Sequence, residues 1–135
     1  MSESLTAKAY LKELRLAPRK TALVAGLVRN RTVDDALVIL SHTPKRAAKP
    51  LAKLISSARA NAINNFDMKA GSLVIDTISV TAGARIKRYR PVARGMAHPY
   101  QKKTSNVLVI VRGEAKPAKK AEASKDAKAE EKESK

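Results

Sequence analysis

The chain has 135 residues, a formal net charge of +16 and no cysteine. This length allows one domain with a modest core, and the missing cysteines exclude disulfides, thiolate nucleophiles and cysteine-based metal sites. Because a net charge of this size attracts polyanions, nucleic acid and an anionic membrane surface are the two candidate partners.

The first 30 residues predict a strand followed by a helix. Residues 6–16 alternate imperfectly between apolar and polar side chains, which favours a strand. Pro18 suits the first turn of a helix, where its missing N–H costs no hydrogen bond. An apolar stripe at helical spacing follows and predicts a buried helix face that ends near Asn30. The stripe consists of Leu23, Val24, Leu27 and Val28.

A second helix is predicted to begin after Thr32 and to end before Pro44. The Thr32 side chain can accept a hydrogen bond from the backbone N–H of Asp35. Asp34 and Asp35 lie in the first turn, where the helix dipole favours negative charge. The predicted buried face contains Val33, Ala36, Leu37 and Leu40.

The third predicted helix is the longest, and its start is ambiguous. Thr43 and Pro44 are a plausible cap and first residue. Pro50 inside a helix would remove a hydrogen bond and clash with the preceding turn. The helix therefore either kinks at Pro50 or begins there. Its predicted buried face contains Ala47, Leu51, Leu54, Ile55, Ala58, Ala62 and Phe66.

From Ser72 onward the pattern changes to that of a β-hairpin. Residues 73–81 are rich in β-branched side chains, and residues 107–111 form a short apolar run typical of an inner strand. The basic segment between them contains the turn formers Arg90-Pro91 and Arg94-Gly95. We expect one antiparallel hairpin over about 78–110, whose distal half projects about 30 Å beyond the body.

Charge is distributed unevenly along the chain. No Asp or Glu occurs between Asp76 and Glu114, whereas eight Lys and Arg residues do. A merely solvated surface mixes both signs, so a window of one sign indicates an anionic partner. An isolated two-stranded ribbon is only marginally stable in water. The cationic hairpin is therefore expected to take its shape from surrounding phosphates.

The distribution of charged residues also divides the chain at Arg112. Residues 1–112 hold 21 basic and six acidic groups, whereas residues 113–135 hold seven Lys and six acids. The second segment has no large apolar residue and cannot offset its own ordering entropy. We predict one globular RNA-binding domain over 1–112, which includes the hairpin, and a disordered tail of Ala, Lys and Glu over 113–135.

Catalysis, metal binding and membrane insertion are not expected. His42 and His98 are the only histidines, and the body has too few acids to complete a metal or nucleophile site around them. No run of about 18 apolar residues is present, and residues 1–15 lack the apolar stretch of a secretory signal. We expect a cytoplasmic protein without enzyme activity, cofactor, metal or membrane.

Five separated segments resemble the large-subunit ribosomal protein family number twenty-two, the bacterial-type protein with an exit-tunnel hairpin. They occur in the family's order, and the resemblance covers nearly all of residues 5–112. The segments are 17–20 (APRK), 57–65 (SARANAINN), 87–95 (KRYRPVARG), 102–105 (KKTS) and 107–111 (VLVIV).

The resemblance implies an α+β fold, with three helices packed on a small three-stranded antiparallel sheet and a long protruding β-hairpin. It implies a structural component of the large ribosomal subunit that binds large-subunit ribosomal RNA and assists early assembly. It further implies a monomer within the ribosome, with neighbouring ribosomal proteins at the polypeptide exit tunnel. The hairpin tip would line this tunnel and meet the nascent polypeptide in passing.

By position, the implied tunnel tip is less cationic than is usual in the family. Val92 and Met96 stand where the family usually has basic residues. Ala17 stands where a serine commonly caps the first helix, so that this cap is expected to be missing. The tip residues are Lys87, Arg88, Pro91, Val92, Ala93, Arg94 and Gly95.

RNA contacts are expected to spread over cationic and aromatic side chains of the helices and the hairpin. Arginine ranks above lysine because it binds phosphate bidentately and stacks on bases. Tyr89 and Tyr100 could stack on unpaired bases or form a cross-strand pair that stiffens the ribbon. The full set is Arg19, Lys20, Lys45, Arg46, Lys49, Lys53, Arg59, Arg85, Lys87, Arg88, Tyr89, Arg90, Arg94, Tyr100, Lys102 and Lys103.

Three other classes of protein remain as alternatives. The first is an architectural DNA-binding protein whose Pro-tipped β-arm inserts Arg90-Pro91 into the minor groove. The second is a membrane-surface protein, which would need a basic amphipathic helix. The third is a nuclease, which would cleave RNA in a metal-dependent reaction.

Overall fold

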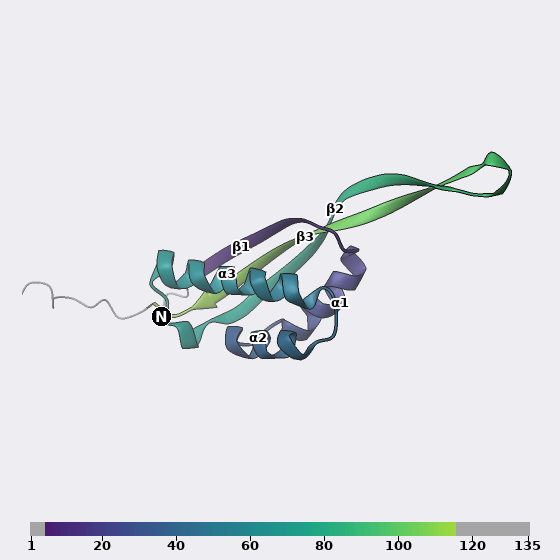
Figure 1. Ribbon diagram of the computed structural model, residues 1–135. Helices are drawn as coiled ribbons and strands as arrows, with labels where there is room; N and C mark the ends of the chain where they lie inside the picture. Colours follow the sequence, from purple (N-terminus) through teal and green to yellow (C-terminus); the bar gives the residue numbers. More distant parts are fainter. Residues whose placement is uncertain (1–4, 116–135) are drawn as a thin grey trace, which may run out of the picture.

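The sheet places β3 between β1 and β2 in the computed structural model, which describes residues 5–115 (Figure 1). β1 spans Leu5–Leu14, β2 spans Val74–Pro91 and β3 spans Ala97–Gly113. Both strand pairs are antiparallel. The predicted inner position of residues 107–111 is confirmed.

Three helices cover one face of this sheet (Figure 1). α1 spans Pro18–Val28, α2 spans Val33–His42 and α3 spans Ala48–Phe66. Two short 3-10 turns, η1 (Ala70–Ser72) and η2 (Ala93–Gly95), precede β2 and join β2 to β3. The predicted α+β fold is thus confirmed, including the hairpin, whose paired strands extend from Val74 to Gly113.

The core lies between the helices and one face of the sheet. In the central layer, Ala9 of β1 pairs with Val109 of β3, which pairs with Ile78 of β2, and all three side chains are buried. Leu51 and Ile55 of α3 are fully buried in the same cluster. The buried set is dominated by alanine and valine, so the core is tight but small in apolar area.

A side-chain cap explains where α2 begins, whereas α3 begins without one after Ala47, so the predicted start at Thr43 and Pro44 is wrong. The Thr32 hydroxyl accepts a hydrogen bond from Asp35 N at 3.2 Å, as predicted. α3 begins at Ala48, so Pro50 occupies its first turn. There the missing N–H has no intrahelical acceptor to lose, and the helix needs no kink. Ala17 precedes α1 and, as expected, supplies no side-chain cap.

Two predictions of buried helix faces were partly wrong. Leu23 of α1 is 73% exposed, and the buried stripe runs instead through Thr21, Val24, Ala25 and Val28. Thr21 is polar, but its hydroxyl lies 3.3 Å from Ala17 O and 3.4 Å from Ser105 Oγ. Leu27 is also exposed. An apolar count along the helix could not identify the true stripe, because one of its members is a threonine.

Phe66 marks the second error, at the end of α3. Its side chain is 43% exposed, because the helix ends there and Asp67 adopts a left-handed conformation with φ 46°. The Met68 N–H then donates to Ala62 O at 3.1 Å, and Met68 is fully buried. Met68 thus occupies the core beyond the helix end, where periodicity predicted Phe66.

A register shift between Ala82 and Arg85 separates the hairpin into a part that belongs to the body and a part that projects. Thr104, which is only 4% exposed, faces this shift from β3 and donates a hydrogen bond from Oγ1 to Ala84 O at 2.6 Å. A Cβ on Gly83 would lie 2.5 Å from the same Oγ1. The close approach therefore requires glycine at this position.

Gly83→Ala is expected to destabilise the protein, because the new methyl group displaces the Thr104 hydroxyl from Ala84. We expect a loss of roughly 1–3 kcal/mol in the free energy of unfolding, typical of overpacking. Urea unfolding followed by circular dichroism measures it. Gly26→Ala is the control: Gly26 lies within α1 with nothing within 4 Å, so alanine should stabilise by up to about 1 kcal/mol. Equal midpoints for Gly83→Ala and the native chain would contradict the prediction.

Candidate nucleic-acid interface

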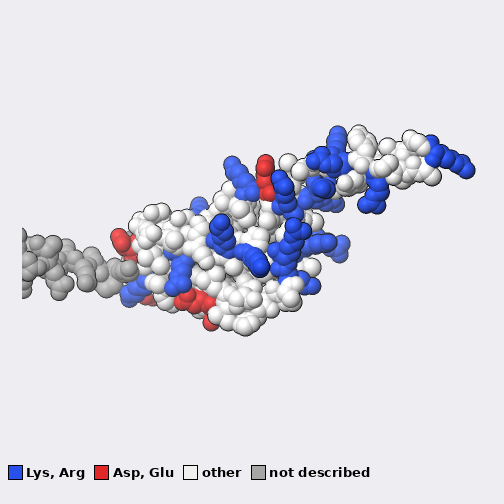
Figure 2. Space-filling view, in the orientation of Figure 1, with Lys and Arg blue, Asp and Glu red and all other residues white. Residues whose placement is uncertain are grey.

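Basic side chains gather where the hairpin leaves the body and along its projecting part (Figure 2). On the face shown, one acidic group lies near the base of the hairpin, and the others lie at the end of the body far from it. The chain contains no acid between Arg85 and Gly113, a range that includes the whole projecting part. This separation of charge gives the molecule one cationic end.

The projecting hairpin is a two-stranded ribbon without a core of its own. Its residue pairs run without interruption from Arg85 opposite Lys103 to Pro91 opposite Ala97. All but the half-buried Ile86 are exposed. Arg85 and Lys103 are like charges placed directly opposite, an arrangement that destabilises a strand pair. An anion bound to the ribbon would remove this repulsion.

The two tyrosines lie on opposite faces of the ribbon. Tyr89 pairs with Pro99, whereas Tyr100 pairs with Arg88, and neighbouring positions on a strand face opposite sides. The expected alternative of a cross-strand tyrosine pair is therefore wrong. Tyr100, 41% exposed, instead lies 5.8 Å from the Arg90 guanidinium, while Tyr89 is 71% exposed. Each ribbon face thus offers one aromatic ring on which a base can stack.

The tip is a tight turn closed by a backbone hydrogen bond from Val92 N to Met96 O at 2.9 Å. Within it, Arg94 and Gly95 adopt left-handed conformations with φ 59° and 69°. Five of the seven predicted tip residues lie at this turn, and Lys87 and Arg88 lie further back on β2. The exposed Val92 and Met96 make the turn partly apolar.

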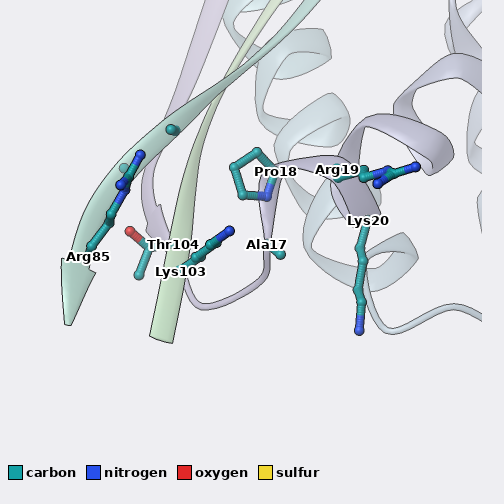
Figure 3. Close-up of a pocket in the computed structure, with 9 residues that line it drawn as sticks. Ala17, Pro18, Arg19, Lys20, Arg85, Lys103 and Thr104 are labelled. Atoms are coloured by element: carbon teal, nitrogen blue, oxygen red, sulfur yellow. The ribbon is translucent and has the colours of Figure 1, made fainter. Parts of the chain in front are cut away.

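A first hollow, of about 430 Å³, separates the start of α1 from the base of the hairpin. Lys103 extends from β3 toward Ala17 and Pro18, whereas Arg19 and Lys20 are directed away from the hairpin strands (Figure 3). Arg85 and Thr104 complete the hairpin side. The structure thus brings four predicted cations to the lining of one hollow, and of these Lys103 extends toward the start of α1 (Figure 3).

A second hollow, which we call the junction notch, lies at the point where the hairpin leaves the body. Its volume is about 460 Å³. Arg15 of the β1–α1 loop and Arg46 of the α2–α3 loop contribute its body side. The hairpin side consists of Ile86, Arg88, Lys102, Lys103 and Thr104. Five of the seven lining residues are therefore cationic and none is acidic.

The remaining predicted cations lie apart from the hairpin. Lys45 and Lys49 line a shallow hollow beside the α2–α3 loop, and Lys53 lines another at the β1–α3 edge. Arg59 differs from them because its guanidinium pairs with Asp34 at 3.0 Å. This ion pair connects α3 to the first turn of α2 and reduces the charge that Arg59 offers to a partner.

Arg15 is the one lining residue of the notch that sequence reasoning missed among the cations. Arg15 is the only charged residue among the three that connect β1 to α1. Its neighbours in the notch are at least 31 positions away in the chain. Arg15 belongs to no cluster of charges along the sequence, so its place in the notch could not be predicted. Only the fold brings Arg15 beside Arg46 and the hairpin.

Within residues 5–115, no three His, Asp or Glu side chains lie close enough to hold a metal ion together. None of the helices in this range is long and apolar enough to cross a membrane.

Comparison with known proteins gives a consistent match. The family described as ribosomal protein L22p/L17e matches residues 9–112. A Mesoplasma florum protein named large ribosomal subunit protein uL22 is 46% identical over 110 residues, which cover 82% of this chain and 98% of the relative. The proteins of the same name from Lactobacillus gasseri and Lactobacillus johnsonii are each 44% identical over 112 residues, covering 82% of this chain and 96% of theirs.

Proposed function

The chain belongs to the ribosomal protein L22p/L17e family, and we propose that it binds large-subunit ribosomal RNA with its cationic end and thereby assists early assembly. As a member, it is a structural component of the large ribosomal subunit, without enzyme activity, and its place is the ribosome in the cytoplasm. Ribosomal RNA and other ribosomal proteins are accordingly its partners.

The observation that supports RNA binding is the projecting ribbon. It holds seven Lys and Arg residues and no acid between Arg85 and Lys103, is almost fully exposed, and places the like charges of Arg85 and Lys103 opposite each other. A bound polyanion would neutralise the repulsion within the ribbon. Its binding is favourable because each neutralised phosphate releases counterions. Arginines and the two exposed tyrosines can contact phosphates and unpaired bases along both faces.

The proposal assigns different roles to parts of the cationic end. The hairpin arms and the loop cations contact RNA phosphates. The hairpin tip, which comprises Lys87, Arg88 and residues 91–95, lines the polypeptide exit tunnel, where it meets neighbouring ribosomal proteins and the nascent chain. Residues 1–112 act as one RNA-binding domain that is monomeric within the ribosome. Of the predicted tail 113–135, residues 113–115 lie against the body, where Lys69 N donates to Glu114 O at 3.0 Å. The rest falls outside the described residues.

A competition assay tests RNA binding. Labelled protein bound to protein-free large-subunit ribosomal RNA is challenged with unlabelled folded ribosomal RNA or with duplex DNA of equal phosphate concentration. We expect ribosomal RNA to displace the protein at a lower concentration at every salt concentration. Stronger displacement by duplex DNA would favour the architectural DNA-binding alternative and overturn the proposal.

Hydrogen exchange gives a prediction about the ribbon itself. In the free protein, amides of 85–101 are expected to exchange far faster than those of 105–111, since an isolated two-stranded ribbon is only marginally stable. Binding to ribosomal RNA should slow exchange in 85–101 and leave 105–111 little changed. Strong protection of 85–101 in the free protein would show that the ribbon needs no partner.

A further inference from the structure

The junction notch gathers its cations from four separate segments of the chain. Arg15 and Arg46 come from two loops of the body, Arg88 comes from β2, and Lys102 and Lys103 come from β3. Within the described residues none of the five is in an ion pair, although three ion pairs exist elsewhere. Arg88 donates only to the carbonyl of the adjacent Lys87, at 3.1 Å.

Five like charges around one hollow repel one another, and the repulsion is largest where the hollow restricts water. No carboxylate lines the notch, so a bound anion would supply the compensating charge. The volume of about 460 Å³ has room for a phosphodiester group with its two sugars. Two arginines on the body side can each bind one phosphate through paired N–H groups.

The position of the notch gives that ligand a mechanical role. The register shift between Ala82 and Arg85 lies immediately before Ile86 and Arg88, so the projecting ribbon begins at the notch. Beyond the shift, β2 and β3 pair only with each other, and β1 pairs with β3 only as far as Ser105. Within residues 5–115, no hydrogen bond or ion pair joins the projecting residues 85–103 to the helices. Apart from the continuity of β2 and β3, a ligand in the notch would be the polar connection between the ribbon and the helices.

We propose that the junction notch binds one backbone phosphate of the RNA and that this phosphate fixes the direction of the hairpin relative to the body. The phosphate is shared between Arg15 and Arg46 on the body and Arg88 and Lys102 on the hairpin. It supplies a polar connection between the ribbon and the two body loops, which share no hydrogen bond or ion pair within the described residues. The inference rests on the proposed binding of ribosomal RNA and adds a defined site and a positioning role to it.

The test uses Arg15→Gln/Arg46→Gln, which removes the body side of the notch and leaves the hairpin unaltered. Lys8→Gln/Lys12→Gln is the matched control: it loses the same charge from exposed positions of β1 that do not line the notch. Because the chain has no cysteine, Val38→Cys and Met96→Cys provide two exposed sites for spin labels on α2 and at the hairpin tip. The distance between the labels is measured in full-length protein, free and bound to protein-free large-subunit ribosomal RNA.

The parent is the spin-labelled Val38→Cys/Met96→Cys protein with an otherwise unchanged sequence. In the parent and in the control, we expect the width of the distribution of distances between the two labels to decrease at least about twofold when RNA binds. In the Arg15→Gln/Arg46→Gln protein it should stay nearly as broad as in the free protein. Its affinity should also fall about tenfold more than that of the control, as expected for lost charge-assisted hydrogen bonds.

The outcomes separate the two proposals. If Arg15→Gln/Arg46→Gln binds RNA with the affinity of the control and its distances narrow equally, the notch does not position the hairpin and the inference fails. If the parent does not bind ribosomal RNA, the proposed function fails. A narrow distribution in the free parent would also overturn the inference, since the direction would then be fixed without a phosphate.

Discussion

Leu51→Ala is expected to destabilise the protein by about 2–5 kcal/mol, the range for truncating a buried leucine. Leu51 is completely buried on α3, in a core whose other members include Ala7, Ala48 and Ala58. Alanine side chains have no rotamers with which to fill a cavity, so relaxation around the missing atoms should be limited. Since small domains are stable by only about 5–15 kcal/mol, a large fraction of that stability would be lost.

Urea unfolding followed by far-UV circular dichroism measures this change. Leu23→Ala is the matched control, because Leu23 is 73% exposed on α1 and its truncation should alter stability by less than about 0.5 kcal/mol. Adding ribosomal RNA should partly restore the Leu51→Ala midpoint, since a ligand that binds only the folded state stabilises it. Identical midpoints for the two leucine variants would show that the core is not organised around α3.

Neutralising the hairpin is expected to give the largest loss of RNA affinity without loss of stability. The variant changes six exposed cations of the ribbon to glutamine. If each neutralises one phosphate, the slope of log affinity against log salt should fall by about 4 to 5. The free energy of unfolding should stay nearly constant, because none of the six is buried. The residues are Arg85, Lys87, Arg88, Arg90, Lys102 and Lys103.

Six glutamine substitutions among the seven lysines of 113–135 provide the control with the same change in net charge. Salt titrations of RNA binding, by fluorescence anisotropy or filter retention, compare the two proteins. If binding depended on total charge alone, both slopes would fall equally, and the assignment of the hairpin as the principal contact would be wrong.

Local patterns were sufficient to predict most of the secondary structure. The Thr32 cap, the proline in the first turn of α1 and the β-branched run before Thr81 depend on neighbours within a few residues, and all three appear as predicted. The hairpin was predictable because two strand patterns flank a segment that contains the turn formers Arg90-Pro91 and Arg94-Gly95. Pro50 was left open, since deciding it required knowing that α3 begins at Ala48.

The remaining features depend on contacts between distant segments. Thr21 is buried because its hydroxyl meets Ser105, which is 84 positions away. The strand register, and with it the opposite orientations of Tyr89 and Tyr100, depends on the shift held by Gly83 and Thr104. Arg15 enters the notch only through the packing of two loops. The pattern of residues along the chain could not predict these contacts between distant segments.

The pairing of the projecting arms only with each other makes the length of the hairpin independent of the core. Deleting two opposite residue pairs, such as 87–88 with 100–101, would shorten it by about 7 Å at about 3.3 Å per residue and keep every remaining side chain on its original face. Deleting a single pair would invert the faces of everything beyond it. Evolution or design can therefore adjust how deeply such a protein penetrates its surroundings in two-pair increments, while the packing of the body stays the same.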